Sequence, residues 1–68
     1  MTVLLTTPSA AELVRHVEAG QMFYVSGYSN RAVRERLNRL GVFSAEAIVS
    51  DAGNGLMCVY PRKNNQER

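Results

Sequence analysis

The chain has 68 residues, of which 46% are apolar and 21% are charged, and its formal net charge is +2. This is the composition of a folded globular protein, and the net charge is too small to indicate nucleic-acid binding by itself. A single cysteine, Cys58, excludes an internal disulfide, and a single histidine, His16, argues against a structural zinc site. Since so short a chain buries only about 60% of the surface that it exposes when unfolded, we expect association to add stability.

No apolar run reaches the roughly 18 residues that a membrane span needs. The N-terminal stretch MTVLLTTPSAAEL has neither the basic region nor the long apolar region of a signal peptide. A lone cysteine is typical of a reducing compartment. The sequence therefore predicts a cytoplasmic protein without a membrane segment, and no residue set in it indicates a cofactor or a metal ion.

The first predicted unit is a strand followed by a helix. Residues 3–5 are apolar and extended in character, and a proline-containing turn follows them. Ser9, with Glu12 three positions later, matches a capping box, and apolar residues then recur at helical spacing. With Gly20 as the C-terminal stop, this pattern predicts a helix over residues 9–19.

The second predicted unit repeats this arrangement twenty residues later. Residues 22–25, MFYV, are large and apolar and lie between two glycines, which predicts a strand. Ser29 can cap a second helix, and Gly41 stands where that helix is expected to end. Two strand–helix units in succession favour crossovers that place both helices on the same face of a sheet.

The last third of the chain is a predicted β-hairpin. Residues 47–49 and residues 56–60 are apolar, and the pair Asn54-Gly55 lies between them. Both residues of that pair tolerate the positive φ of a two-residue hairpin turn. Pro61 is expected to end the last strand, because proline cannot donate a hydrogen bond to a neighbouring strand.

The predicted order is β-α-β-α-β-β, which indicates a two-layer α/β (α+β) sandwich with a small mixed sheet and two helices on one face. We expect residues 1–61 to form one domain and residues 62–68 to be a polar tail. The alternative is a winged helix, with the arginine-rich segment as recognition helix and residues 46–60 as the wing. That fold requires another helix before the recognition helix, and the preceding segment QMFYVSGY is strand-like and too short for one.

Two of the predicted strands are apolar on both sides. Side chains alternate between the two faces of a strand, so the continuous apolar runs MFYV and LMCVY indicate that both faces are covered. Two short helices can cover only one face, and an exposed apolar face usually marks an interface. We therefore expect a homodimer or a stable complex with another protein through the second face, with these interface residues: Met22, Tyr24, Met57 and Val59. The residues that alternate with them along the same strands are the alternative. Tyr24, Tyr28 and Tyr60 are the expected interface anchors, because tyrosine combines a large area with a polar tip.

The predicted second helix carries four arginines. Glu35 can pair with Arg31 or Arg39, each four residues away, which favours a solvated, ion-paired face over a phosphate-binding one. Arginine and tyrosine are enriched at protein interfaces. The residues predicted to bind a partner are Tyr28, Arg31, Arg34, Glu35 and Asn38. The nucleic-acid alternative uses Arg31, Arg34, Arg36, Arg39, Arg62 and Lys63.

The two predicted strand–helix junctions form a further candidate site. If the first two strands are parallel neighbours, residues 6–9 and residues 26–29 lie close together at the carboxyl end of the sheet, where α/β folds bind ligands. Helix N-termini attract anions, so Ser26, Gly27 and Ser29 are candidates for binding a phosphate or carboxylate. Serine is also a common helix cap, and capping alone is the simpler interpretation.

Neither His16 nor Cys58 has the neighbouring nucleophile, base or acid that a catalytic set needs. We therefore predict a non-enzymatic protein-interaction module that docks on a protein partner. A small regulator or inhibitor, of the kind that phages and mobile elements encode, fits this size class. The alternatives are a nucleic-acid-binding regulator and an anion- or nucleotide-binding module.

Overall fold

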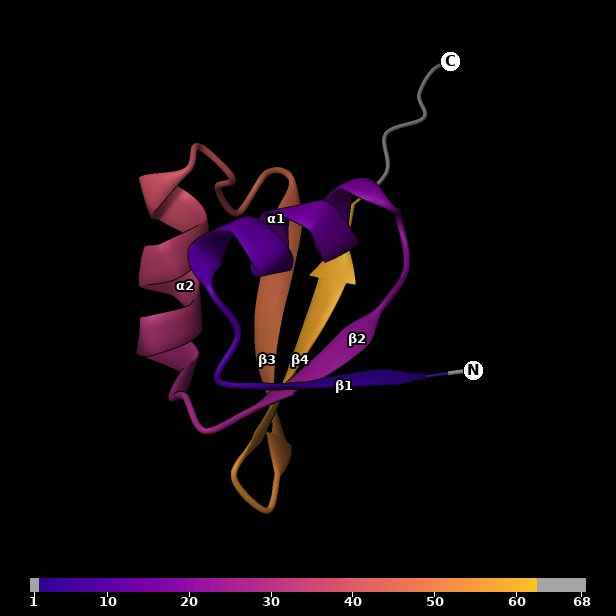
Figure 1. The fold of residues 1–68 in the computed structure, drawn as a ribbon, viewed down its shortest axis with the longest axis vertical. Helices are drawn as coiled ribbons and strands as arrows, with labels where there is room; N and C mark the ends of the chain where they lie inside the picture. The colour runs from indigo at the N-terminus through magenta and orange to yellow at the C-terminus, as the bar shows by residue number, and fades with distance from the viewer. Residues whose placement is uncertain (1, 63–68) are drawn as a thin grey trace.

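Four strands form one sheet, and two helices lie on one of its faces (Figure 1). The computed structural model describes residues 2–62; Lys63 and the rest of the predicted polar tail lie outside the described residues. The elements are β1 (Val3–Thr6), α1 (Ala10–Glu18), β2 (Phe23–Ser26), α2 (Asn30–Arg39), β3 (Ala47–Gly53) and β4 (Leu56–Pro61). The predicted order and the two-layer α+β sandwich are confirmed, and the segment before α2 is the strand β2, which rules out the winged helix.

The strand order in the sheet is β1-β2-β4-β3. β1 and β2 are parallel, as expected of strands joined by a helix, and the other two pairs are antiparallel. β3 and β4 form a hairpin, and β4 lies between β3 and β2 in the sheet. The sheet is therefore mixed, with β1 and β3 as its two edges.

Both helices begin at the serines that the sequence indicated. The Ser9 side chain accepts a hydrogen bond from the amide of Glu12, and the Glu12 side chain accepts one from the amide of Ser9, which completes the capping box. Ser29 accepts from the amide of Ala32. None of the helices formed by residues 2–62 is long and apolar enough to span a membrane.

The hairpin turn is also the predicted one. Asn54 and Gly55 both have positive φ, 56° and 78°, as a tight two-residue turn of this kind requires. The pairing of β3 with β4 shifts between Asp51 and Gly53, so the strand is irregular next to the turn.

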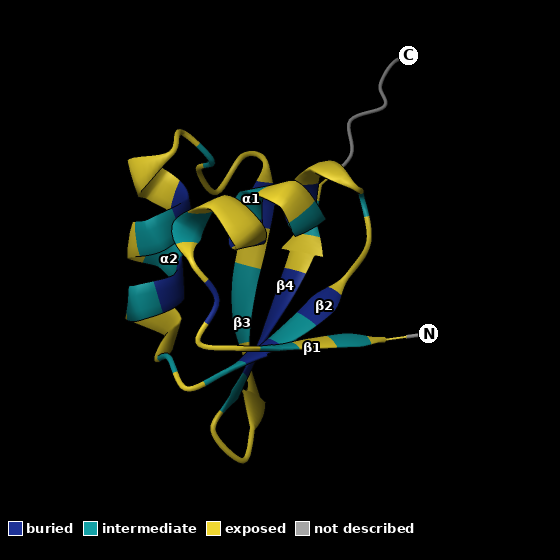
Figure 2. Cartoon of the chain, viewed as in Figure 1, coloured by how far each residue is buried: buried dark blue, intermediate teal, exposed yellow. Residues whose placement is uncertain are grey.

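The hydrophobic core lies between the helices and one face of the sheet, and buried positions alternate with half-buried ones along β2 (Figure 2). Leu13 and Val17 of α1 contribute to this core together with Val33 and Leu37 of α2. The sheet contributes Phe23, Val25, Ala47, Met57 and Val59. Side chains alternate between the two faces along each strand, so one face of the sheet packs in this core and the other face carries the remaining side chains.

Candidate interaction surface

The sheet has an open face, which is the face opposite the two helices. The strand register places Leu4, Tyr24, Cys58 and Ser50 side by side across all four strands. The neighbouring row contains Ile48 of β3 opposite Tyr60 of β4. These positions alternate with the core residues Phe23, Val25, Met57 and Val59 along β2 and β4, so their side chains point away from the helices. Each strand therefore contributes large side chains to the open face.

This open face is apolar and accessible. Four of its large side chains are more than a third exposed: Leu4 55%, Met22 39%, Ile48 42% and Tyr60 46%. Met22 precedes β2 and continues the side of Tyr24, two residues away. The strand residues of this face are Leu4, Thr6, Tyr24, Ser26, Ile48, Ser50, Leu56, Cys58 and Tyr60, and none carries a charge. An uncharged apolar face of this kind is typical of an interaction surface.

Cys58 lies at the centre of the open face and is nevertheless buried, because larger neighbours surround it. A hydrogen bond with the Cys58 side chain raises the pKa of Tyr60, and the charge of the ionised thiol, desolvation and the nearby Tyr24 act in the same direction. Both tyrosines therefore belong to one side-chain cluster around the thiol. Tyrosine combines a large apolar ring with a polar tip, which suits it to an interface.

Two of the four predicted interface residues are wrong. Met22 and Tyr24 lie on the open face, but Met57 and Val59 are buried beneath the helices. The register pairs Val25 with Met57 and Phe23 with Val59, so both belong to the core side of the sheet. The sequence-based prediction named Tyr60 as an interface anchor, and Tyr60 is exposed on the open face, but the prediction did not name Leu4, Ile48 or Cys58. Alternation along β4 places Cys58 and Met57 on opposite faces, although it does not determine which of them faces the helices.

Arg34, a predicted partner-binding residue, is used within the fold. Its guanidinium donates to the backbone carbonyls of Ala47 and Val42 and to the side chain of Asn38. These bonds connect α2 to the start of β3 and to the loop between them. The side chain is half-buried, and its hydrogen bonds stabilise the packing of α2 against β3.

We expect Arg34→Met to lower the free energy of unfolding by about 1–2 kcal/mol, because a carbonyl of the sheet edge loses a charged donor. The apolar part of the side chain is retained in methionine. Arg39→Met removes an equal charge at an exposed position of the same helix and is expected to change stability by less than about 0.5 kcal/mol. Urea unfolding followed by circular dichroism measures both, and equal effects would contradict a structural role for Arg34.

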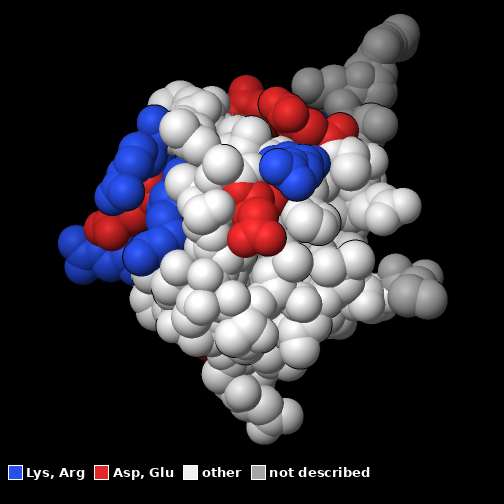
Figure 3. Space-filling view, in the orientation of Figure 1, with Lys and Arg blue, Asp and Glu red and all other residues white. Residues whose placement is uncertain are grey.

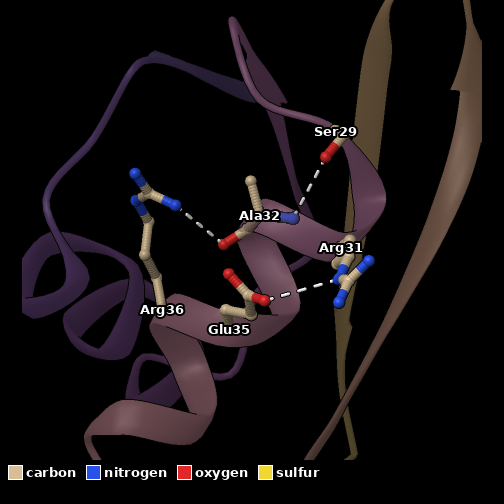
Figure 4. Close-up of polar contacts among 5 residues, drawn as sticks. All are labelled: Ser29, Arg31, Ala32, Glu35 and Arg36. Atoms are coloured by element: carbon tan, nitrogen blue, oxygen red, sulfur yellow. Dashed lines mark hydrogen bonds and ion pairs between the residues drawn. The ribbon is translucent and has the colours of Figure 1, made fainter.

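Tyr28 also has internal partners. Its hydroxyl donates to the carbonyl of Pro8 at 2.9 Å, and the guanidinium of Arg36 lies 4.0 Å from the centre of its ring. Arg36 in addition donates to the carbonyl of Ala32 (Figure 4). Tyr28 thus joins the two strand–helix junctions, and its side chain is half-buried with internal contacts at both the hydroxyl and the ring.

Part of the positive charge on the outer face of α2 is neutralised by an ion pair within the helix. Arg31 and Glu35 form an exposed ion pair at 3.4 Å, one of the two pairings that the sequence predicted (Figure 4). The basic side chains gather along α2 with acidic atoms among them (Figure 3). Asn38 and Arg39 are exposed on the same helix. An exposed pair of this kind contributes little stability and lowers the local field that a phosphate would meet.

The predicted proximity of the two junctions is confirmed. The amide of Thr7 donates to the carbonyl of Ser26 at 3.0 Å, and the Ser26 hydroxyl donates to that of Thr6 at 3.3 Å. The hydroxyl of Ser29 is engaged in capping α2. The hydroxyls of Ser26 and Ser29 are thus both bonded to the protein's own groups, and the missing Cβ atom of Gly27 allows the close approach of the two segments.

His16 and Cys58 lie on different sides of the sheet. A ring nitrogen of His16 contacts the carbonyl of Glu12, and the ring packs on Phe23 of the core, with 5.4 Å between ring centres. Residues 2–62 contain no group of three or more side chains suited to a metal ion. A shallow pocket of about 250 Å³ between the end of α1 and the end of β4 has these lining residues: Val17, Glu18, Val42, Glu46, Pro61 and Arg62.

Comparisons with protein-family models, with curated proteins and with solved structures gave no match to this chain.

Proposed function

We propose that this protein is a non-enzymatic interaction module that docks on another protein through the open face of its sheet. The observation that supports this proposal is the group of exposed apolar side chains from β1, β3, β4 and the residue before β2, which lie beside the half-buried Tyr24 on a face whose strand residues carry no charge. Covering ~300 Å² of such a surface is worth on the order of 7 kcal/mol before the costs of association. That gain is comparable with the whole stability of a small domain, which suits a small regulator or inhibitor that acts by occupying a surface of its target.

Site-specific photo-crosslinking tests this proposal with a matched pair of aromatic positions. A photoreactive phenylalanine analogue replaces Tyr60 on the open face or Phe43 in the loop after α2, which are exposed to a similar extent. We expect the probe at position 60 to give a discrete adduct with one protein in the cell that produces this chain. The probe at position 43 is expected to give none. Equal labelling from both positions, or none from position 60, would contradict docking through this face.

Once the adduct is identified, substitution on the open face is expected to weaken that complex. Ile48→Ser removes a large apolar side chain from the face and should raise the dissociation constant by about 10- to 100-fold, since full burial of such a side chain is worth about 1.5–3 kcal/mol. Leu40→Ser, at an exposed leucine just after α2, is the control and should leave the affinity unchanged. Isothermal titration calorimetry with the identified protein measures both.

The nucleic-acid alternative has less support, because Arg34 and Arg36 contact other parts of the protein and Arg31 is paired with Glu35. A gel shift at two salt concentrations separates it from protein docking. Binding to nucleic acid through the arginines would weaken steeply as salt rises, and Arg31→Glu would abolish it. Docking through the uncharged open face would be insensitive to both changes.

A further inference from the structure

The two edges of the sheet differ in how their outward backbone groups are satisfied. At the β3 edge the carbonyl of Ala47 accepts from Arg34, and the carbonyl of Val49 accepts from the Asn30 side chain at 3.1 Å. Asn30 and Arg34 are one helical turn apart on α2, so they reach successive outward carbonyls of the strand. The helix thereby covers two outward carbonyls in the first half of β3, which hinders the addition of another strand along that part of the edge.

The β1 edge has no such cover within residues 2–62. The amide of Thr7 donates to the carbonyl of Ser26 in β2, and backbone groups alternate in direction along a strand. Val3 and Leu5 therefore bond to β2, whereas the N–H and C=O groups of Leu4 and Thr6 point away from the sheet. The strand Val3–Thr6 contains no proline, charge or bulge, which are the usual devices that prevent strand addition at an edge.

We propose that β1 pairs antiparallel with β1 of a second copy, about a two-fold axis that passes beside Leu4. In this register Leu4 exchanges two hydrogen bonds with Leu4 of the other copy, and Thr2 of each copy exchanges two with Thr6 of the other. Every outward group between Thr2 and Thr6 then has a partner. The two four-stranded sheets become one sheet of eight strands.

A second copy fits this edge for two reasons. The outward groups are spaced symmetrically about Leu4, so the edge is complementary to itself, as a two-fold interface requires. The strand is uncharged, so two copies meet without repulsion. Pairing would also place the exposed side chains of Leu4 from both copies next to each other on the open face.

This inference goes beyond the proposed function, because it uses the sheet edge and leaves the open face of both copies free. Joining the copies would present two open faces side by side and make docking bivalent. The dimer is expected to be weak on its own, since pairing one short strand buries less area than stable interfaces do.

Light scattering of the full chain at concentrations up to about 1 mM tests the dimer. We expect twice the mass of one chain for the wild type. Leu4→Pro removes the central outward N–H, at a position whose N–H does not bond to β2, and is expected to give a monomer. Leu4→Ala keeps that N–H and is the matched control, expected to dimerise within about tenfold of the wild-type affinity.

Three results would overturn the proposal: a wild type that is monomeric at the highest concentration, a Leu4→Pro variant that remains dimeric, or loss of the dimer in both variants. The last result would mean that the Leu4 side chain carries the association, which leaves docking through the open face standing. Hydrogen exchange on the wild type decides the matter if Leu4→Pro does not fold. The Leu4 and Thr6 amides should exchange on the order of tenfold more slowly at high than at low concentration, and unchanged rates would refute the pairing.

Discussion

Replacing Phe23 with alanine is expected to unfold the isolated protein at 25 °C. Phe23 is 1% exposed and is the largest of the fully buried side chains, and it lies in β2 beneath α1. Removing a buried phenylalanine costs about 3–5 kcal/mol, because it loses the transfer energy of the ring and leaves a cavity. A domain of this length has a total stability of only about 3–10 kcal/mol, so the loss is comparable with the whole.

The control for this substitution is Phe43→Ala, at a side chain that is 53% exposed in the loop after α2. It removes the same atoms from a position that is already largely in water, so we expect a loss below about 1 kcal/mol. Urea titrations of the wild type and both variants, followed by far-ultraviolet circular dichroism, give the comparison. Similar losses for the two phenylalanines would contradict the placement of Phe23 in the hydrophobic core between the sheet and the helices.

Gly27→Ala is expected to destabilise the fold by about 2–5 kcal/mol through two separate effects. Gly27 has a φ of +89°, where an L side chain costs roughly 1–2 kcal/mol. A Cβ atom at this position would also lie 2.5 Å from the Cγ2 atom of Thr7, which forces the two junctions apart. Overpacking of this kind costs typically a further 1–3 kcal/mol.

Gly41→Ala separates the two effects. Gly41 follows α2 with a φ of +88°, and nothing lies within 4 Å of the position of its Cβ atom, so only the backbone strain is expected there. The double variant Gly27→Ala, Thr7→Ser removes the clashing methyl group and should recover the difference between the two glycine sites. Thermal and urea unfolding measure all of these variants. A loss at Gly27 no larger than that at Gly41 would show that the junctions have room to separate.

The parts of the fold that could be predicted from the sequence are those that depend on near neighbours in the chain. The capping box at Ser9 and Glu12 involves residues three apart, and the turn at Asn54-Gly55 requires two adjacent residues with positive φ. The order of strands and helices along the chain could be predicted from such signals, because each signal involves only residues that are close in sequence. The closeness of the two junctions could also be predicted, since parallel strands end at the same edge.

The composition of the candidate site could be predicted only in part. An uncovered apolar face was expected from strands that are apolar on both sides, and the structure has one. Of the four residues predicted for this face, Met57 and Val59 are wrong, because Met57 and Val59 face the core while Cys58 faces the open side. A shift of one residue in register exchanges the two faces of a strand, and nothing within LMCVY distinguishes the two arrangements.

The sequence by itself determined where the strands and helices lie, that they form two layers, and that one sheet face is left uncovered. The tertiary structure alone decided the strand order, the membership of the open face, and the internal use of Arg34 and Tyr28. The physical reason is the range of the interactions. Caps, turns and periodicity act over a few residues, whereas register and cross-strand hydrogen bonds join residues that only the packed sheet brings together.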